Sequence, residues 1–255
     1  MMIIWLASYP KSGDELLRTL LSTYVFSQDG SYNSELLNNI KIFPSNELFV
    51  QLGVDTNNEE AMYKNYISSQ KLYFDEKSIR FLKTHSCFIN TKDFQFTDKH
   101  NTLGVIYVVR DPRSISFSLA NDMGQTTNQA TEIILTHQHL GKDSSDHCLT
   151  NIGSWKYHYN SWKTFNKFNR YCLIKYEDLI HDTEKVFTEI LKFICRMAKV
   201  KFTVEQDKFK NTLKTCDLSK IKEFEKKENS SSDKEDIGNL EKELKNEMKE
   251  LNYLK

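Results

Sequence analysis

The sequence predicts an α/β fold of three layers, in which a central, mostly parallel β-sheet is flanked by helices. Two observations predict it. Short apolar runs of strand length alternate along the chain with segments whose apolar residues recur at helical spacing. The strongest run, residues 103–109, is continuous and rich in β-branched side chains. Such a run is typical of a strand buried on both faces of a parallel sheet.

Length and composition indicate one domain covering residues 1–255. The chain has 255 residues, of which 39% are hydrophobic, and this is enough to bury a sizeable core. Lysine plus arginine and aspartate plus glutamate number 35 each, so there is no global basic charge to favour nucleic acid or a membrane surface as partner. Any anion site is therefore expected to be local.

Cysteine usage and hydropathy indicate where the protein works. The five cysteines are scattered singly, which suits reduced thiols better than disulfides or a zinc site. The apolar runs fall well short of the roughly 20 residues of a membrane span, and residues 1–7 lack the basic flank of a signal peptide. We therefore expect a protein with no membrane span, located in the cytoplasm.

The first elements form a strand, a tight loop and a helix. An apolar strand at residues 2–7 leads through the loop 8–13 into a helix at residues 14–21. A helix start aims its unpaired N–H groups at whatever lies in such a loop, and Lys11 adds a positive charge there. Phosphate or sulfate is the natural ligand of this junction.

Short helices and loops are expected over residues 29–79, followed by two further strands. The run at residues 80–85 is apolar and ends in polar residues, as a second buried strand would. The strand at 103–109 runs directly into Arg110-Asp111-Pro112-Arg113, where Pro112 suits the first position of a helix.

The second half continues the alternation. Residues 122–150 indicate a loop region with one short helix, and a strand is expected between two helices. A polar stretch without apolar residues is then interpreted as a mobile loop, and a charged helix ends the chain. In order, the expected elements are a helix at 155–168, a strand at 171–175, a helix at 184–194, the loop at 225–236 and the helix at 240–251.

Three strands end in polar residues that can meet at one edge of the sheet. Lys11 follows the first strand, Lys83 and His85 end the second, and Arg110 follows the third. Parallel sheets bind ligands beyond the carboxyl ends of their strands. Two cations for anionic groups and a histidine that accepts a proton near neutral pH make a site for transferring a group from an anionic donor.

Four segments stand out in order along the chain. They are Tyr9-Pro10-Lys11-Ser12-Gly13, Lys83-Thr84-His85, Arg110-Asp111-Pro112-Arg113 with Ser118, and Tyr176-Glu177-Asp178-Leu179. The usual Gly-Lys-Ser order of a phosphate loop is absent, which argues against a metal-dependent ATP or GTP hydrolase. Taken together, the segments resemble the signatures of the cytosolic-type, PAPS-dependent sulfotransferases, where PAPS is 3′-phosphoadenosine 5′-phosphosulfate. The resemblance covers roughly residues 2–195 and implies the P-loop-NTPase-like form of the three-layer fold.

The resemblance implies catalytic roles for three residues. Lys11 would stabilise the charge on the bridging oxygen as the sulfuryl group departs. His85 would be the general base that takes the proton of an acceptor hydroxyl, while Lys83 would neutralise the sulfuryl oxygens. The resemblance implies that the reaction would be an in-line displacement and would require no metal.

The resemblance also implies which residues bind the co-substrate. Arg110 and Ser118 would hold its 3′-phosphate, and Tyr176 would lie near the adenine. The sequence leaves the acceptor open among the hydroxyls of small molecules, glycans and lipids, and it leaves the oligomeric state open. The loop and first helical turn would hold the 5′-phosphate through Ser12, Gly13, Asp14 and Glu15.

Two departures from the family pattern are expected to weaken donor binding. Asp14 and Glu15 replace small polar residues, and a carboxylate about 5 Å from the phosphate opposes it by roughly 3 kcal/mol at an effective dielectric near 20. The helix dipole returns only ~0.3–1 kcal/mol, so repulsion wins unless these side chains reach solvent or pair with a cation. Residues 231–240 stand where the family carries a basic loop, with Lys234 as the only cation.

Two alternative functions follow from the same residues. The chain is either a degenerate nucleotide-binding module of this fold, with weak or no turnover, or a phosphoryl-transfer enzyme of related fold that needs magnesium. Tyr176 has an alternative interpretation as a packing residue.

Overall fold

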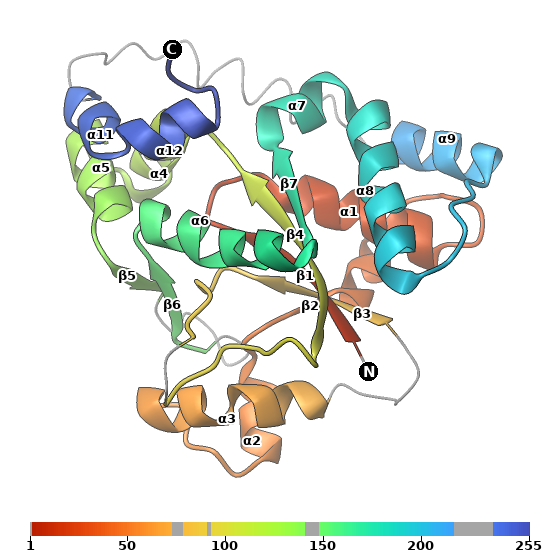
Figure 1. Cartoon of the computed structure of the whole chain (residues 1–255), viewed down its shortest axis with the longest axis horizontal. Helices are drawn as coiled ribbons and strands as arrows, with labels where there is room; N and C mark the ends of the chain where they lie inside the picture. Colours follow the sequence, from red (N-terminus) through yellow and green to blue (C-terminus); the bar gives the residue numbers. More distant parts are fainter. Residues whose placement is uncertain (1, 73–78, 91–92, 141–147, 217–236) are drawn as a thin grey trace.

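The computed structural model describes residues 2–72, 79–90, 93–140, 148–216 and 237–255. Its centre is a five-stranded sheet in the order β2-β3-β1-β4-β7, in which every neighbouring pair is parallel (Figure 1). The strands are β1 (Met2–Ser8), β2 (Lys41–Ile42), β3 (Ile79–Thr84), β4 (Thr102–Val109) and β7 (Tyr171–Lys175). The three-layer α/β fold expected from the sequence is confirmed.

Alternation along β1 sends side chains into two separate cores. Ile4 and Leu6 face one core, whereas Trp5 and Ala7 face the other. The first core is completed by α1 (Asp14–Phe26), α8 (Thr183–Ala198) and α9 (Gln206–Thr215). The second includes α6 (Trp155–Lys163), on the opposite face of the sheet. Both faces are thus covered, and for that reason all eight residues of β4 are buried.

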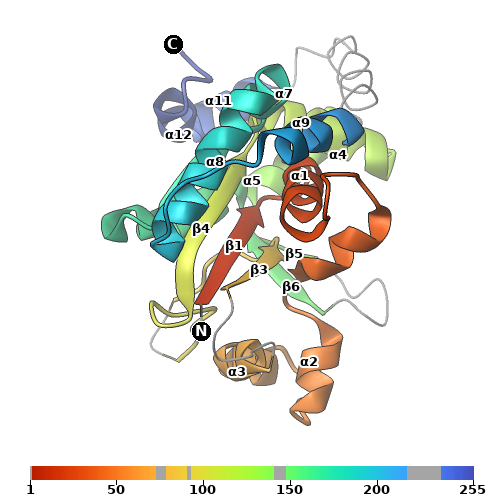
Figure 2. The same ribbon diagram turned by 90° about the vertical axis from the view of Figure 1, so that its right-hand side faces the viewer.

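The remaining helices extend the molecule beyond the two ends of the sheet. Two of them, α2 and α3, lie together at the end that holds the N-terminus, and α11 and α12 lie at the opposite end (Figures 1 and 2). These other helical segments are η1 (Ser34–Asn39), α2 (Asn46–Gln51), α3 (Glu59–Lys71), α4 (Pro112–Met123), α5 (Thr127–Leu135), η2 (Thr164–Phe168), α7 (Tyr176–His181), α11 (Gly238–Glu243) and α12 (Lys245–Glu250).

Residues 122–150 hold more structure than one short helix in a loop. A second, two-stranded antiparallel sheet pairs β5 (Gln138–Leu140) with β6 (Thr150–Gly153). The one short helix expected here is α5, which begins at a reciprocal capping box formed by Thr126 and Gln129. Strands of two to four residues carry too little periodicity to be found from sequence, and this also explains why β2 was missed.

The single helix expected at residues 240–251 is wrong: two short helices, α11 and α12, occupy this region. The backbone leaves the helical region at Leu244, which has φ −103° and ψ 12°. Leu240, Leu244 and Met248 are all buried, so apolar side chains along both helices pack into the core. The polar loop expected at 225–236 lies outside the described residues. In the described part of the chain, no helix is long and apolar enough to span a membrane.

Candidate functional site

The loop between β1 and α1 is built around two residues with left-handed backbone. Lys11 has φ 66° and Gly13 has φ 79°. Gly13 is required on a second ground, since a Cβ placed there would lie 2.1 Å from a ring carbon of Tyr176. The neighbouring Ser12 Oγ is fully buried and has no hydrogen-bond partner among the described residues. A buried hydroxyl in this state is ready to bond a ligand.

Parallel pairing brings Lys83 to the same edge of the sheet as this loop. Leu6 of β1 pairs in register with Lys83 of β3. The Lys83 side chain is buried, and its Nζ lies 2.8 Å from Asp14 Oδ2 and also contacts the Glu15 carboxylate. Without a cationic partner, these two carboxylates would repel a bound phosphate. In the structure both are paired with a lysine, which is the condition that offsets the repulsion.

His85 is held in one tautomer by a backbone carbonyl. Its Nδ1 lies 2.9 Å from the carbonyl oxygen of Ser8, and because a carbonyl only accepts, Nδ1 carries the proton. The neutral ring therefore keeps its lone pair on Nε2, which lies 3.9 Å from Asp14 Oδ2. A nitrogen that is unprotonated and directed into a polar site has the form that a general base needs.

A second histidine supports the first from behind. His158 Nε2 lies 3.1 Å from the His85 carbonyl oxygen and must donate to it, so Tyr107 Oη, at 2.8 Å, donates to His158 Nδ1. Burial, together with the charge that His85 carries when protonated, lowers the pKa of His158 to about 3. His158 is therefore neutral at physiological pH and acts as a fixed spacer between β4 and the base.

Opposing effects set the charge states of the acid–lysine cluster. Burial alone would raise the pKa of the Asp14 carboxyl, but the charge that His85 carries when protonated and the charge of Lys83 outweigh burial and hold this pKa below its usual value. Burial alone would lower the pKa of Lys83, whereas the carboxylates of Asp14 and Glu15 hold it above its ordinary value. Asp14 and Lys83 are therefore both ionised at neutral pH.

Arg110 links the β4 end of the site to the loop. Its Nη1 donates a 3.1 Å hydrogen bond to the Lys11 carbonyl, and its guanidinium carbon lies 4.8 Å from the centre of the Tyr176 ring. Asp111 caps the start of α4 and pairs with Arg113. Tyr176 is packed between Gly13 and Arg110, and Ser118 is buried on α4.

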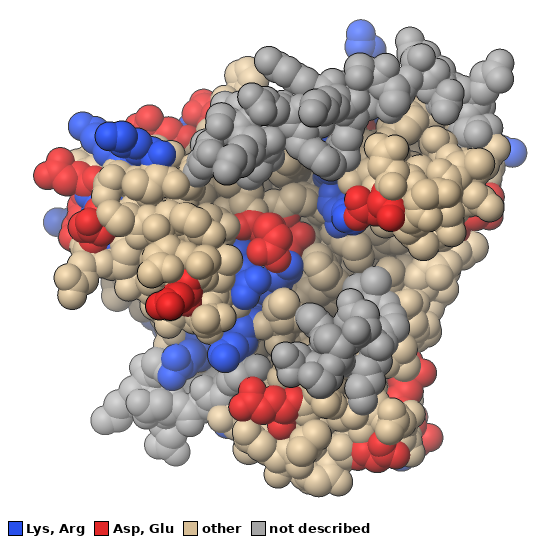
Figure 3. All heavy atoms as spheres, turned by 180° about the vertical axis from the view of Figure 1, so that it is seen from behind, with Lys and Arg blue, Asp and Glu red and all other residues tan. Residues whose placement is uncertain are grey.

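Sequence reasoning missed the partner of Lys11. The Lys11 ammonium forms an ion pair with Asp122 in the last turn of α4, and both side chains are partly exposed. One signal was available, because Asp122 lies four residues after Ser118 and hence on the same face of α4. Both lysines of the site thus carry carboxylate partners. Figure 3 shows the molecule from behind relative to Figure 1. Basic side chains lie directly beside acidic ones near the centre of the face in view.

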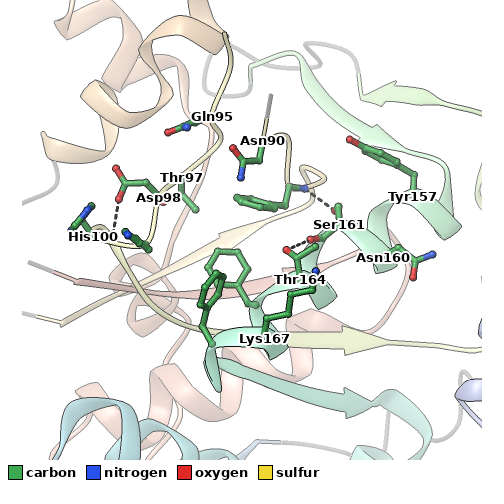
Figure 4. A pocket seen from close by; sticks show the side chains of 14 residues that line it. Asn90, Gln95, Thr97, Asp98, His100, Tyr157, Asn160, Ser161, Thr164 and Lys167 are labelled. Atoms are coloured by element: carbon green, nitrogen blue, oxygen red, sulfur yellow. Dashed lines mark hydrogen bonds between the residues drawn. The ribbon is translucent and has the colours of Figure 1, made fainter. Parts of the chain in front are cut away.

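A cavity of about 810 Å³ lies between the segment that follows β3 and the end of α6. None of the predicted site residues lines it. Phe88, Asn90 and Lys167 are among its lining residues, and Ser161 is fixed there by accepting a 2.9 Å bond from the Phe88 amide (Figure 4). Among the described residues, no group of three His, Cys, Asp or Glu side chains is arranged to hold a metal ion.

Comparison with known proteins gives a family match and a shared fold. The family model described as "Sulfotransferase domain" matches residues 3–251. No curated protein matches. A mouse sulfotransferase, SULT7A1, complexed with PAP is 20% identical, with a TM-score of 0.51, and the alignment covers 91% of this chain and 68% of that one. Retinol dehydratase in a complex with retinol and PAP is 14% identical, with a TM-score of 0.56 and coverage of 97% and 81%. The resemblance expected from the four motifs is confirmed.

Proposed function

The chain belongs to the sulfotransferase domain family, and on this basis we propose that it transfers a sulfuryl group from PAPS to an acceptor hydroxyl. The observation that carries the proposal is the place of His85. Its Nε2, which carries the lone pair when the ring is neutral, lies at the sheet edge that also holds Lys83 and the phosphate-binding type of loop around Lys11. Base, cation and helix start come from neighbouring strands, so one reacting centre can reach all three.

The chemistry assigned to this geometry is a single displacement at sulfur. His85 Nε2 takes the proton from the acceptor hydroxyl as the new O–S bond forms. The bond from sulfur to the bridging oxygen breaks at the same time, and that oxygen leaves on the 5′-phosphate of PAP. Lys11 stabilises the negative charge that develops on the leaving oxygen, and Lys83 does so for the sulfuryl oxygens.

Residues at the loop fit the co-substrate. Ser12 Oγ, buried and without a partner in the described residues, would donate to the 5′-phosphate beside the start of α1. Arg110 and Ser118 are assigned to the 3′-phosphate, and Tyr176 to the adenine. The PAP named for both structural neighbours supports PAPS as the co-substrate. In this proposal the reaction needs no metal.

The acceptor is a hydroxyl on a small molecule, a glycan or a lipid. Retinol in one neighbour is an alcohol, which supports a hydroxyl acceptor here. We place the protein in the cytoplasm, because its five cysteines are scattered singly along the sequence with no C-x-x-C pair, a pattern that suits reduced thiols.

A transfer assay with sulfur-labelled PAPS and a panel of hydroxyl acceptors tests the proposal. Label moves to an acceptor with the wild type, and His85→Ala lowers the rate by about 10²–10⁴-fold, the usual contribution of a general base. His85→Ala should still be stabilised thermally by PAP, which separates a lost base from a lost fold. Label transfer by His85→Ala at the wild-type rate contradicts the assignment of the base.

A binding module without turnover is the second candidate function. The ion pairs of Lys11 with Asp122 and of Lys83 with Asp14 and Glu15 favour it, because both lysines are engaged by the chain's own carboxylates. Thermal stabilisation by PAP without label transfer to any acceptor would identify this function.

A further inference from the structure

The two carboxylates on Lys83 differ sharply in burial. The Asp14 side chain is 7% exposed, whereas the Glu15 side chain is 57% exposed. If Asp14 separated from Lys83, a buried charge would be left without its partner, which is costly. Glu15 can turn into solvent and recover its hydration at little cost. The contact between Glu15 and Lys83 is therefore the one that a ligand can displace.

Arg18 is a second cation that can pair with the Glu15 carboxylate once it leaves Lys83. Arg18 follows Glu15 by one helical turn, and its Nη1 lies 3.4 Å from Glu15 Oε2. Arg18 is itself held in place, since it donates hydrogen bonds of 3.1 and 3.0 Å to the carbonyls of Ile40 and Leu37. Glu15 thus bridges Lys83 and Arg18, and if it releases Lys83 it stays bonded to Arg18.

We propose that Glu15 is a built-in competitor of the anionic donor at Lys83, a contact that the donor displaces. The inference rests on the proposed function, in which Lys83 serves the sulfuryl oxygens. In the absence of an anionic ligand, the Glu15 carboxylate is paired with the Lys83 ammonium. On binding, the donor takes the place of Glu15, and Glu15 pairs with Arg18 alone. Asp14 stays on Lys83 and beside His85 throughout, and so keeps these two side chains aligned.

Competition has a consequence for selectivity among anions. A ligand whose charge reaches Lys83 must replace a carboxylate, so an anion that makes no other contacts gains little at this position. A donor with two phosphates gains binding elsewhere, at the start of α1 and at Arg110, and can offset the displacement. Glu15 therefore favours large, multiply anchored anions over inorganic sulfate or phosphate.

Calorimetric titration with PAPS tests the proposal, with no acceptor present and at low temperature so that turnover is negligible. Glu15→Gln removes the competing charge and should tighten binding about three- to tenfold, the range expected for a half-exposed ion pair that also repels the ligand. Glu15→Asp keeps the charge but shortens the side chain by one methylene, so that it no longer reaches Lys83, and it should also tighten binding. Inorganic sulfate, titrated in parallel, should gain at least as much as PAPS.

Glu189→Gln is the matched control. Glu189 is 58% exposed and pairs with Lys192 at 2.7 Å on α8, so this variant removes an equivalent ion pair outside the site and should leave PAPS affinity unchanged. Unchanged affinity in both Glu15 variants overturns the competition while leaving the proposed function intact. Tighter binding by Glu15→Gln but not by Glu15→Asp also overturns it, because general charge repulsion then suffices. Failure of every protein to bind PAPS overturns both the competition and the proposed function.

Discussion

Replacing Asp14 with asparagine removes the buried half of the charge cluster and should destabilise the fold. The Lys83 side chain is only 6% exposed, and its Nζ lies 2.8 Å from Asp14 Oδ2. Breaking a buried ion pair from one side costs roughly 3–5 kcal/mol when the remaining charge is left alone. Here Lys83 keeps Glu15, a more exposed partner, so we expect a smaller loss of about 2 kcal/mol.

A loss of this size is easily measured by thermal unfolding. In a chain of 255 residues, about 2 kcal/mol corresponds to a fall in Tm of roughly 4–8 °C. Asp122→Asn is the control, since it breaks an ion pair in which both side chains are partly exposed, and it should cost no more than about 1 kcal/mol. Equal stability of Asp14→Asn and the wild type would refute the reasoning from burial.

The same variant should change how stability depends on pH. The pKa of Asp14 is held below its ordinary value of 3.8 in the folded chain. The carboxylate therefore contributes stability that is fully present above pH 3.8 and is lost as pH falls through the lowered pKa. We expect the stability gap between wild type and Asp14→Asn to close in that acidic range. A gap that stays constant down to the acid transition would show that the charge of Asp14 is not what stabilises the fold.

Three further predictions follow from other parts of the site. Because the pKa of His158 is lowered to about 3 from 6.5, stability should fall as pH drops below 6.5, by roughly 2 kcal/mol at pH 5; His158→Gln should abolish this slope in acid titrations followed by circular dichroism. Gly13→Ala should cost about 2 kcal/mol or more in denaturant unfolding, because φ is 79° and the new Cβ meets the Tyr176 ring; Gly124→Ala, at φ 60° with open space around it, should cost less. Label transfer from PAPS should be undiminished by a chelator, and complete loss would favour the magnesium-dependent alternative.

The sheet and its edge were predictable because their signals are local. Strands expected at residues 2–7, 103–109 and 171–175 agree within one residue with β1, β4 and β7. Continuous apolar runs of this length have few other structures open to them in an α/β chain. Because ligands bind beyond the carboxyl ends of parallel strands, the sequence also predicts that Lys11, Lys83 and His85 lie together.

The charge pairing within the site was not predictable in the same way. Lys83 lies 68 positions from Glu15, and Lys11 lies 111 positions from Asp122. Contacts at such separation depend on how elements pack, and side-chain periodicity says nothing about them. Repulsion from Asp14 and Glu15 was expected unless they reached solvent or paired with a cation, and the sequence did not show which cation that would be. In the structure it is Lys83, at the end of β3, which pairs with both carboxylates.

A crystal structure with PAP bound tests the central claim most directly. We expect the 5′-phosphate at the start of α1, bonded to Ser12 Oγ, and the 3′-phosphate at Arg110 and Ser118. The 5′-phosphate oxygen that is the leaving group of the reaction should face the side of the site that holds His85 Nε2. PAP bound elsewhere on the molecule, or a β1–α1 loop that stays without ligand at millimolar PAP, would contradict the account.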